Sequence, residues 1–319
     1  MADLVPRPAV TRPAVTAIIV VRDGEPYLAE AIESVLSQTL DDWELLVVDD
    51  GSTDRTPDIV RSYAERTRSR IRLLAHPDGA NLGIAASRNR GIASARGRYI
   101  AFLDADDVWL PEKLAEQVAI LDSDPELGLV YGRTLIWWSW AGPEGREDFY
   151  YPLGVEPDRR HDPPVLFELL LRNEAQTPTT CNAMMRSDLF AALGGFEPRF
   201  RGMFEDVTFF GKALATTPAH VSDRTWAKYR QHSANCSAAR FTAESYCSTR
   251  LPFLNWLSAH LIRTGVARTS PVWKAVQTHT WLCRHPRYFQ LANQICFRKK
   301  QLAGLFARIR ADRQTFALS

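Results

Sequence analysis

Two patterns of apolar residues alternate along residues 14–121. Short unbroken runs of apolar, mostly β-branched side chains are typical of buried strands, and four occur here: Val15–Val21, Leu45–Val48, Ile71–Leu74 and Tyr99–Leu103. Other stretches carry apolar residues at helical spacing, which predicts amphipathic helices over Leu28–Leu36, around Ile59–Ala64, over Ile84–Ala95 and from Pro111 to Leu121. This half of the chain therefore alternates strand and helix.

Strands that alternate with helices form a mostly parallel sheet covered by helices on both faces. We therefore expect an α/β domain of Rossmann-like type over residues 14–240, preceded by a loose tail over 1–13. Its second half is less regular, and there we expect a long loop over Ala141–Pro164, a short helix over Val165–Leu171 and an edge strand over Trp226–Arg230. Helical patterns dominate residues 241–319, which we expect to form a helical C-terminal region.

Acidic residues follow two of the predicted strands directly. Asp49-Asp50 ends the second strand, and Asp104-Ala105-Asp106-Asp107 ends the fourth. In parallel sheets ligands bind beyond the carboxyl ends of the strands. Carboxylates this close resist joint ionisation unless a cation compensates, and hard oxygen ligands suit Mg²⁺ or Mn²⁺ shared with a phosphate group. The alternative is an Asp-rich turn with no ligand.

Several classes of protein are excluded by what the chain lacks. The first strand is followed by Arg22-Asp23-Gly24-Glu25-Pro26, so the GxGxxG dinucleotide fingerprint is missing, and no GxxxxGK[ST] loop occurs. No apolar run approaches the ~20 residues of a membrane-spanning helix. The five cysteines show no CxxC spacing, which favours a reducing compartment, and we expect a cytoplasmic protein.

A series of short motifs, in one order, resembles the family 2 glycosyltransferases, which have the GT-A fold. The motifs run from Val15 to Ser237: Val15–Val21, Ala31–Thr39, Leu46–Asp54, Asn81–Gly83, Ala86–Ile92, Gly97–Asp107, Gly194–Phe196, Glu205-Asp206 and Tyr229–His232. The resemblance implies transfer of a sugar, with inversion, from a nucleotide diphosphate donor (usually a UDP-sugar) to a glycan or lipid-linked acceptor. Such an enzyme would act in polysaccharide or glycolipid biosynthesis.

The resemblance also implies roles for individual residues. Asp50 would hydrogen-bond the base of the donor nucleotide, and Asp104 would contact its ribose or the bound metal. Asp106, the last acid of the DxD motif, would coordinate Mn²⁺ or Mg²⁺, and Asp206 matches the catalytic base.

One segment departs from the family pattern. The family often has Pro-x-(Tyr/Phe)-Asn after the first strand, where this chain has Val20-Val21-Arg22-Asp23. The backbone can still wrap the base there, without the aromatic ring. We therefore count Val20, Arg22 and Ala105 among the donor-binding candidates.

Four more polar residues are candidates on chemical grounds. Glu205, beside Asp206, would raise the pKa of that carboxyl toward a useful general base or bind the acceptor. His232 would act as a third metal ligand or pair with phosphate. Arg88 would reach Asp104 or the diphosphate, and Asn81 would shape the loop near the nucleotide. Each has a plain alternative: a helix start, a surface histidine, an exposed arginine and a loop residue.

Charge is unevenly spread along the chain. The net charge is +2, but Leu261 to Ser319 holds 11 Lys or Arg and one acid, Asp312. Basic, aromatic-rich helices lie on anionic membrane surfaces, so we expect either peripheral contact with the inner membrane face or docking onto the acidic body or a second copy in a homo-oligomer. No nucleic-acid-binding motif occurs.

Two other functions compete with transfer. A nucleotide-sugar-binding scaffold subunit without turnover would keep the donor site, although intact Asp50, Asp106 and Asp206 argue against decay of the activity. A sugar nucleotidyltransferase would need a Gly-rich basic loop after the first strand, and this chain does not have one.

Overall fold

The computed structural model describes residues 12–67, 70–142, 146–173, 175–232 and 242–291. The chain divides into two compact units, Met1–Ala238 and Ala239–Ser319. The first unit carries the sheet and the candidate site. The second carries two helices packed on each other, α8 (Ala243–Arg263) and α9 (Pro271–Arg284).

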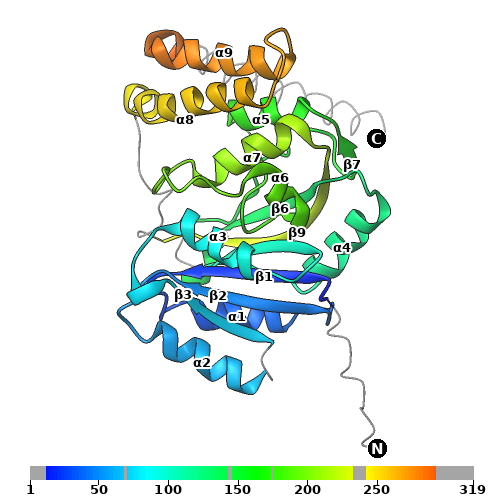
Figure 1. The fold of residues 1–319 in the computed structure, drawn as a ribbon, viewed down its shortest axis with the longest axis vertical. Helices are drawn as coiled ribbons and strands as arrows, with labels where there is room; N and C mark the ends of the chain where they lie inside the picture. The colour runs from blue at the N-terminus through cyan, green and yellow to red at the C-terminus, as the bar shows by residue number, and fades with distance from the viewer. Residues whose placement is uncertain (1–11, 68–69, 143–145, 174, 233–241, 292–319) are drawn as a thin grey trace, which may run out of the picture. The chain divides into compact units, whose positions relative to one another are not determined.

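One mixed sheet organises the first unit (Figure 1). Its strands are β1 (Val15–Val21), β2 (Trp43–Asp49), β3 (Ile71–Ala75), β4 (Tyr99–Asp104), β5 (Val108–Trp109), β6 (Leu129–Trp137), β7 (Arg159–His161), β8 (Met184–Arg186) and β9 (Ala219–Arg230). They are ordered β3-β2-β1-β4-β8-β6-β9-β5, and β7 pairs with β9. The β3-β2-β1-β4 half is wholly parallel, as the alternating pattern predicts.

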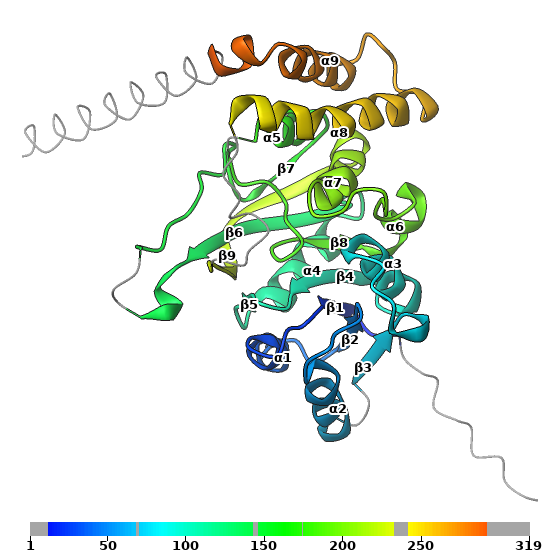
Figure 2. The ribbon, with the colours of Figure 1, turned by 90° about the vertical axis from the view of Figure 1, so that its left-hand side faces the viewer.

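Helices cover both faces of this parallel half. The helices of the first unit are α1 (Leu28–Leu36), α2 (Thr56–Arg66), α3 (Ile84–Ser94), α4 (Lys113–Ser123), α5 (Val165–Arg172), α6 (Ser187–Leu193) and α7 (Glu205–Thr216), with short 3₁₀ turns η1 (Pro77–Gly79) and η2 (Ser139–Ala141). Figure 2 shows α1 and α2 on one face of β1–β3 and α3 on the other. The arrangement confirms the expected α/β fold, with helices on both faces of parallel strands.

The parallel strands form the centre of the hydrophobic core. Every residue of β2 is buried, and six of the seven residues of β1 are buried. Strands covered on both faces read as unbroken apolar runs rather than as alternating ones. For this reason the four apolar runs correctly predicted four strands, and each predicted end lies within two residues of the observed one.

Two expectations for the second half are wrong. The expected edge strand is the end of the 12-residue β9, which pairs with β5, β6 and β7 and so lies inside the sheet. Exposed Asp223 and Arg224 interrupt its apolar pattern, and the pairing with β6 shifts register there. The expected loop over Ala141–Pro164 contains β7, whose three polar residues give no apolar signal.

The helices offer no membrane span. Within the described ranges, none is both long enough and apolar enough to cross a bilayer.

A buried lysine fixes the segment that lines the candidate site. Lys113, on α4, is 0% exposed, and its Nζ donates to Gln117 Oε1 (2.6 Å) and to the carbonyls of Asn182 (3.3 Å) and Ala183 (3.4 Å). No salt bridge joins it to a carboxylate of the described residues. Burial therefore lowers the pKa of Lys113 from 10.5 to about 7.

This burial predicts a pH dependence of stability. Between pH 7 and 10.5 the unfolded chain holds a proton on Lys113 that the folded chain releases, so the free energy of unfolding rises with pH. Lys113→Met removes this contribution, whereas Lys274→Met, at an exposed position of α9, keeps it. Urea unfolding across this pH range measures the slopes, and equal slopes in wild type and Lys113→Met would contradict the assignment.

Candidate active site

The register of the parallel strands gathers the acidic residues at one edge of the sheet. Val20, near the end of β1, lies opposite Val48 on one side and Asp104 on the other, and Val21 lies opposite Asp49. The carboxyl ends of β2 and β4 therefore flank that of β1. This confirms that the two acidic clusters share one rim.

Asp104 is held by an arginine and a threonine. Arg88 Nη2, on α3, donates to Asp104 Oδ1 (3.2 Å), and Thr180 Oγ1 donates to Asp104 Oδ2 (3.1 Å). The Arg88 side chain is buried, and its Nη1 has no hydrogen-bond partner among the described residues. Arg88 is therefore not the exposed helix arginine of the alternative interpretation, and it contacts Asp104 as expected.

Asp106 and His232 meet across the chain. His232 Nε2 lies 3.0 Å from Asp106 Oδ2. Burial and the nearby charge of Asp104 raise the pKa of Asp106, and the His232 contact opposes that rise. His232 is thus part of the acidic rim, as a metal-ligand interpretation requires.

Asp107 faces inward and has a structural role. It is 0% exposed, its Oδ1 accepts from the backbone N–H of Arg230 (3.0 Å), and its Oδ2 has no partner among the described residues. Burial first, and then the carboxylates of Asp104 and Asp106, raise its pKa well above the ordinary value. Burial and these neighbouring carboxylates thus both disfavour the charged form of Asp107.

The pair of Asp106 and His232 fits a divalent cation as two ligands of a larger set. No group of three or more His, Cys, Asp or Glu side chains in the described ranges could hold a metal ion alone. A carboxylate oxygen and an imidazole nitrogen suit Mn²⁺, and Mg²⁺ prefers to complete its octahedron with phosphate oxygens and water. The donor set therefore fits a cation that arrives with a diphosphate.

Glu205 and Asp206 occupy the first turn of α7. Phe204, the residue before the helix, has a left-handed φ of 66°, a backbone conformation that is costly for a side chain of this size and recurs at functional sites. Burial raises the pKa of Asp206, and the positive charge of Arg88 opposes the rise. Burial and the Asp206 carboxylate raise the pKa of Glu205, whose buried Oε2 has no described partner.

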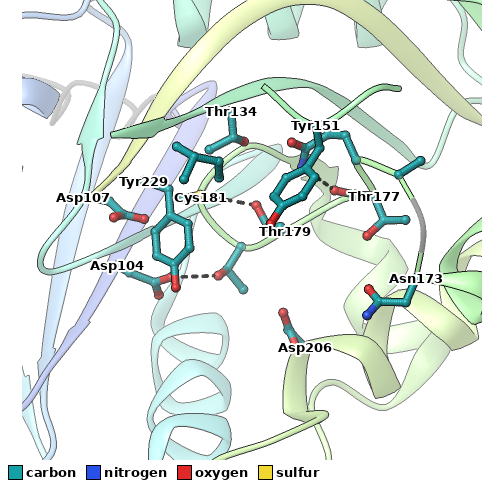
Figure 3. Close-up of a pocket in the computed structure, with 14 residues that line it drawn as sticks. Asp104, Asp107, Thr134, Tyr151, Asn173, Thr177, Thr179, Cys181, Asp206 and Tyr229 are labelled. Carbon is teal, nitrogen blue, oxygen red and sulfur yellow. Dashed lines mark hydrogen bonds between the residues drawn. The ribbon is translucent and has the colours of Figure 1, made fainter. Parts of the chain in front are cut away.

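Three carboxylates, those of Asp104, Asp107 and Asp206, line a cavity of about 270 Å³. Figure 3 shows Asp206 facing the cavity from α7, across from Asp104 at the end of β4. Hydroxyl groups and two aromatic rings line the rest of the wall, from Thr134, Tyr151, Thr177, Thr179, Thr180 and Tyr229. The cavity can thus bind a polyhydroxylated molecule between an acidic strand end and a second, half-buried acid.

The remaining candidates lie on loops at the same rim. Asp50 accepts hydrogen bonds from the backbone N–H groups of Leu82 (2.8 Å) and Gly83 (3.0 Å), so it already anchors the loop that carries Asn81. Arg22 is exposed beside Asp23, and Ala105 is partly buried. No hydrogen bond joins Asn81 or Arg22 to the acidic cluster within the described residues, and their donor-binding roles stay predictions.

Three residues were missed by the sequence analysis. Thr180 bonds Asp104, Tyr151 lines the cavity, and Tyr27 stacks on the His232 ring with 5.1 Å between centroids. Of these three residues, only Thr180 could have been found from the sequence, because its segment lies between two apolar elements and contains consecutive threonines. Tyr27 is 205 positions from His232, and no local pattern reports such a contact.

Comparison with known families agrees with the fold and the rim. Residues 16–194 match the family described as glycosyl transferase family 2. The match covers more than half of the chain, so the chain belongs to this family.

Individual relatives match different shares of the chain. An uncharacterized glycosyltransferase of Rickettsia typhi is 30% identical over 70% of this chain and 65% of its own length. A putative teichuronic acid biosynthesis glycosyltransferase, TuaG of Bacillus subtilis, is 38% identical over 34% of this chain and 42% of its own length. The chain thus spans less than half of this second relative and about two thirds of the first.

Solved structures share the fold at low identity. S. aureus TarS 1–349 in complex with UDP-GlcNAc superposes with a TM-score of 0.63 at 19% identity, over 86% of this chain and 72% of that chain. The mannosyltransferase PcManGT from Pyrobaculum calidifontis, in complex with GDP-Man and Mn²⁺, gives 0.56 at 22% identity, over 86% of this chain and 71% of that chain.

Proposed function

We propose that this chain is an inverting, divalent-metal-dependent glycosyltransferase. It would move a sugar from a nucleotide diphosphate donor, a UDP-sugar, to a hydroxyl of a glycan or lipid-linked acceptor in polysaccharide or glycolipid biosynthesis. The observation that carries the proposal is the cavity that Asp206 and Asp104 both line. The Asp106–His232 pair at the same strand end supports it.

The donor side would be built by the ends of β4 and β9. Asp106 and His232 would hold Mn²⁺ or Mg²⁺, which supplies charge stabilisation for the departing diphosphate. Asp104 would contact the ribose or the metal, and Arg88, already bonded to Asp104, would direct its unbonded Nη1 to the donor. Val20, Asp50 and the loop with Asn81 would surround the base.

The acceptor side would be built by α7. Asp206 would take the proton of the acceptor hydroxyl as that oxygen attacks the anomeric carbon from the face opposite the diphosphate. A base in that position must be ionised, and its burial raises its pKa, which strengthens it as a proton acceptor. Glu205 would orient the acceptor or the loop before α7.

Nucleotide binding tests the donor half of the proposal. Because a ligand of the folded state raises the melting temperature, UDP should do so in a Mn²⁺-dependent way. Melting with UDP, GDP, dTDP and CDP, each with and without Mn²⁺, identifies the base. Asp106→Asn should lose the Mn²⁺-dependent part of the shift. No shift with any of the four nucleotides would favour a scaffold subunit instead.

Asp206→Asn tests the base. The amide cannot accept the acceptor proton, so sugar transfer, or slow hydrolysis of the donor where no acceptor is added, should fall roughly 10²- to 10⁴-fold, with the nucleotide melting shift unchanged. In wild type, kcat/KM should fall with acidification at a pH above the ordinary Asp value of about 3.9, since the pKa of Asp206 is raised. Wild-type turnover in Asp206→Asn would remove this residue from the mechanism.

We further propose that the second unit contacts an anionic membrane surface on the cytoplasmic side, where a lipid-linked acceptor would lie. Trp281 (49% exposed) and Tyr288 (56%) pack on each other with 5.3 Å between ring centroids. Exposed Arg284 and Arg287 lie beside them, and residues 261–291 contain no Asp or Glu. Exposed aromatic rings flanked by arginine suit the headgroup region of an anionic bilayer.

Vesicle sedimentation tests this contact. Wild type should bind phosphatidylglycerol vesicles at low salt and dissociate from them at high salt. It should not bind phosphatidylcholine vesicles. Trp281→Ala/Tyr288→Ala should weaken binding severalfold, whereas Phe149→Ala/Tyr150→Ala, which removes exposed rings from the first unit, should not. Equal binding by both double variants, or a concentration-dependent dimer lost only in the first, would contradict a membrane role for this face.

A further inference from the structure

A cluster of three aromatic rings around one arginine lies next to the Asp106–His232 pair. We call it the aromatic cage, and it consists of Tyr27, Trp137, Trp140 and Arg230. Tyr27 precedes α1, Trp137 ends β6, Trp140 lies in η2, and Arg230 ends β9. Three segments distant in sequence, around Tyr27, Trp137–Trp140 and Arg230, therefore meet beside the two candidate metal ligands.

Arg230 is the centre of the cage. It is 3% exposed, and its guanidinium carbon lies 4.5 Å from the ring centroid of Trp137, 4.9 Å from that of Trp140 and 5.1 Å from that of Tyr27. A buried guanidinium among ring faces is a favourable cation–π arrangement. A salt bridge to Glu30 of α1 balances its charge.

The same arginine fixes the backbone of the acidic strand end. Arg230 Nε donates to the carbonyl oxygen of Asp106 (2.7 Å), and its backbone N–H donates to Asp107 Oδ1 (3.0 Å). Asp106 is therefore anchored through its main chain, which leaves its carboxylate for His232. Arg230 therefore positions the backbone of Asp106 and is not itself a ligand of the cation.

The rings of the cage fix His232. The imidazole stacks on Tyr27 at 5.1 Å and 27°, and the Tyr27 ring in turn meets Trp140 edge-on at 5.8 Å. Trp140 Nε1 donates to the carbonyl of Gln231 (2.8 Å), and the Gln231 N–H donates to the carbonyl of Trp137 (3.0 Å). The residue before His232 is thus bonded at both backbone groups, and the ring of His232 has a flat partner on one face.

We infer that the aromatic cage is a positioning device for the divalent cation, with Tyr27 as its specific positioning residue. The inference rests on the proposed function, since it assumes that Asp106 and His232 are ligands. Groups that orient metal ligands typically change metal affinity 10- to 100-fold when removed. Tyr27 also follows directly on the turn after β1, so the cage joins that turn to the metal ligands.

That turn is itself tied to the loop after β2. The N–H of Asp23 donates to Ser52 Oγ (2.9 Å), the Thr53 N–H donates to Asp23 Oδ1 (2.7 Å), and the Gly24 N–H donates to Thr56 Oγ1 (2.8 Å). A continuous series of contacts therefore connects the end of β2 to His232, through the turn after β1 and then Tyr27. We therefore expect a substitution of Tyr27 to lower the affinity for the cation more than the affinity for the nucleotide.

The test is a Mn²⁺ titration followed by electron paramagnetic resonance, with the full chain at saturating UDP. Tyr27→Leu should raise the Kd for Mn²⁺ by roughly tenfold, and Tyr27→Phe, which keeps the ring that stacks on His232, should match wild type. UDP binding without metal should be equal in all three proteins. Excess Mn²⁺ should restore the activity of Tyr27→Leu, with kcat recovered.

Two further variants make the result decisive. Tyr63→Leu removes another tyrosine that packs under an arginine, Arg66, on α2, and it should lower stability without changing Mn²⁺ affinity. Asp106→Asn should abolish Mn²⁺ binding. If Asp106→Asn binds Mn²⁺ as wild type does, the metal site and this inference both fail. If Asp106→Asn loses Mn²⁺ while Tyr27→Leu keeps wild-type affinity, the cage is structural only and the proposed function stands.

Discussion

The crowding of carboxylates at the end of β4 is the constraint on which the rest of the site depends. Asp104, Asp106, Asp107 and Asp206 all act on one another or on a common arginine, and burial raises the pKa of the last three. Such a group is stable only if some members stay neutral and others find a cation. Each surrounding feature, from Arg88 to His232, can be understood as part of that compensation.

The compensation divides the acids into different roles. Asp107 is fully buried, which raises its pKa, and its Oδ1 accepts a hydrogen bond from the backbone N–H of Arg230. Asp104 has its own cation in Arg88. Among the described residues the partner of the Asp106 carboxylate is the imidazole of His232, so a metal ion would compensate its charge further. Arg88 also lowers the pKa of Asp206, so one side chain acts on both the strand end and the opposite wall of the cavity.

The sequence was sufficient for the parallel half of the fold and for the chemistry at its rim. Doubly buried strands leave unbroken apolar runs, and carboxylates at their ends stand out, so β1, β2, β3, β4 and the acidic clusters could be predicted. The predicted contact of Arg88 with Asp104 is also found, and His232, predicted as a metal ligand or a partner of phosphate, lies 3.0 Å from Asp106 Oδ2. The family motifs, and not periodicity, pointed to the second of these.

What the sequence could not predict depends on contacts between distant segments. The exposed residues Asp223 and Arg224 interrupt the apolar pattern of β9, so the whole strand could not be predicted. The three polar residues of β7 form a strand only by pairing with β9. No local pattern places Trp137 and Trp140 around Arg230 beside the acidic rim, because Arg230 lies about 90 positions further along the chain. Tyr27 meets His232 only because α1 and the end of β9 converge.

The central claim is that Asp106 and His232 hold a divalent cation on the donor diphosphate. Anomalous diffraction at the manganese edge, from crystals grown with UDP and MnCl₂, tests it most directly. The account predicts one strong peak in contact with Asp106 Oδ2, with His232 and with the diphosphate. A well-ordered UDP with no manganese peak, or a peak bound by other side chains, would contradict it.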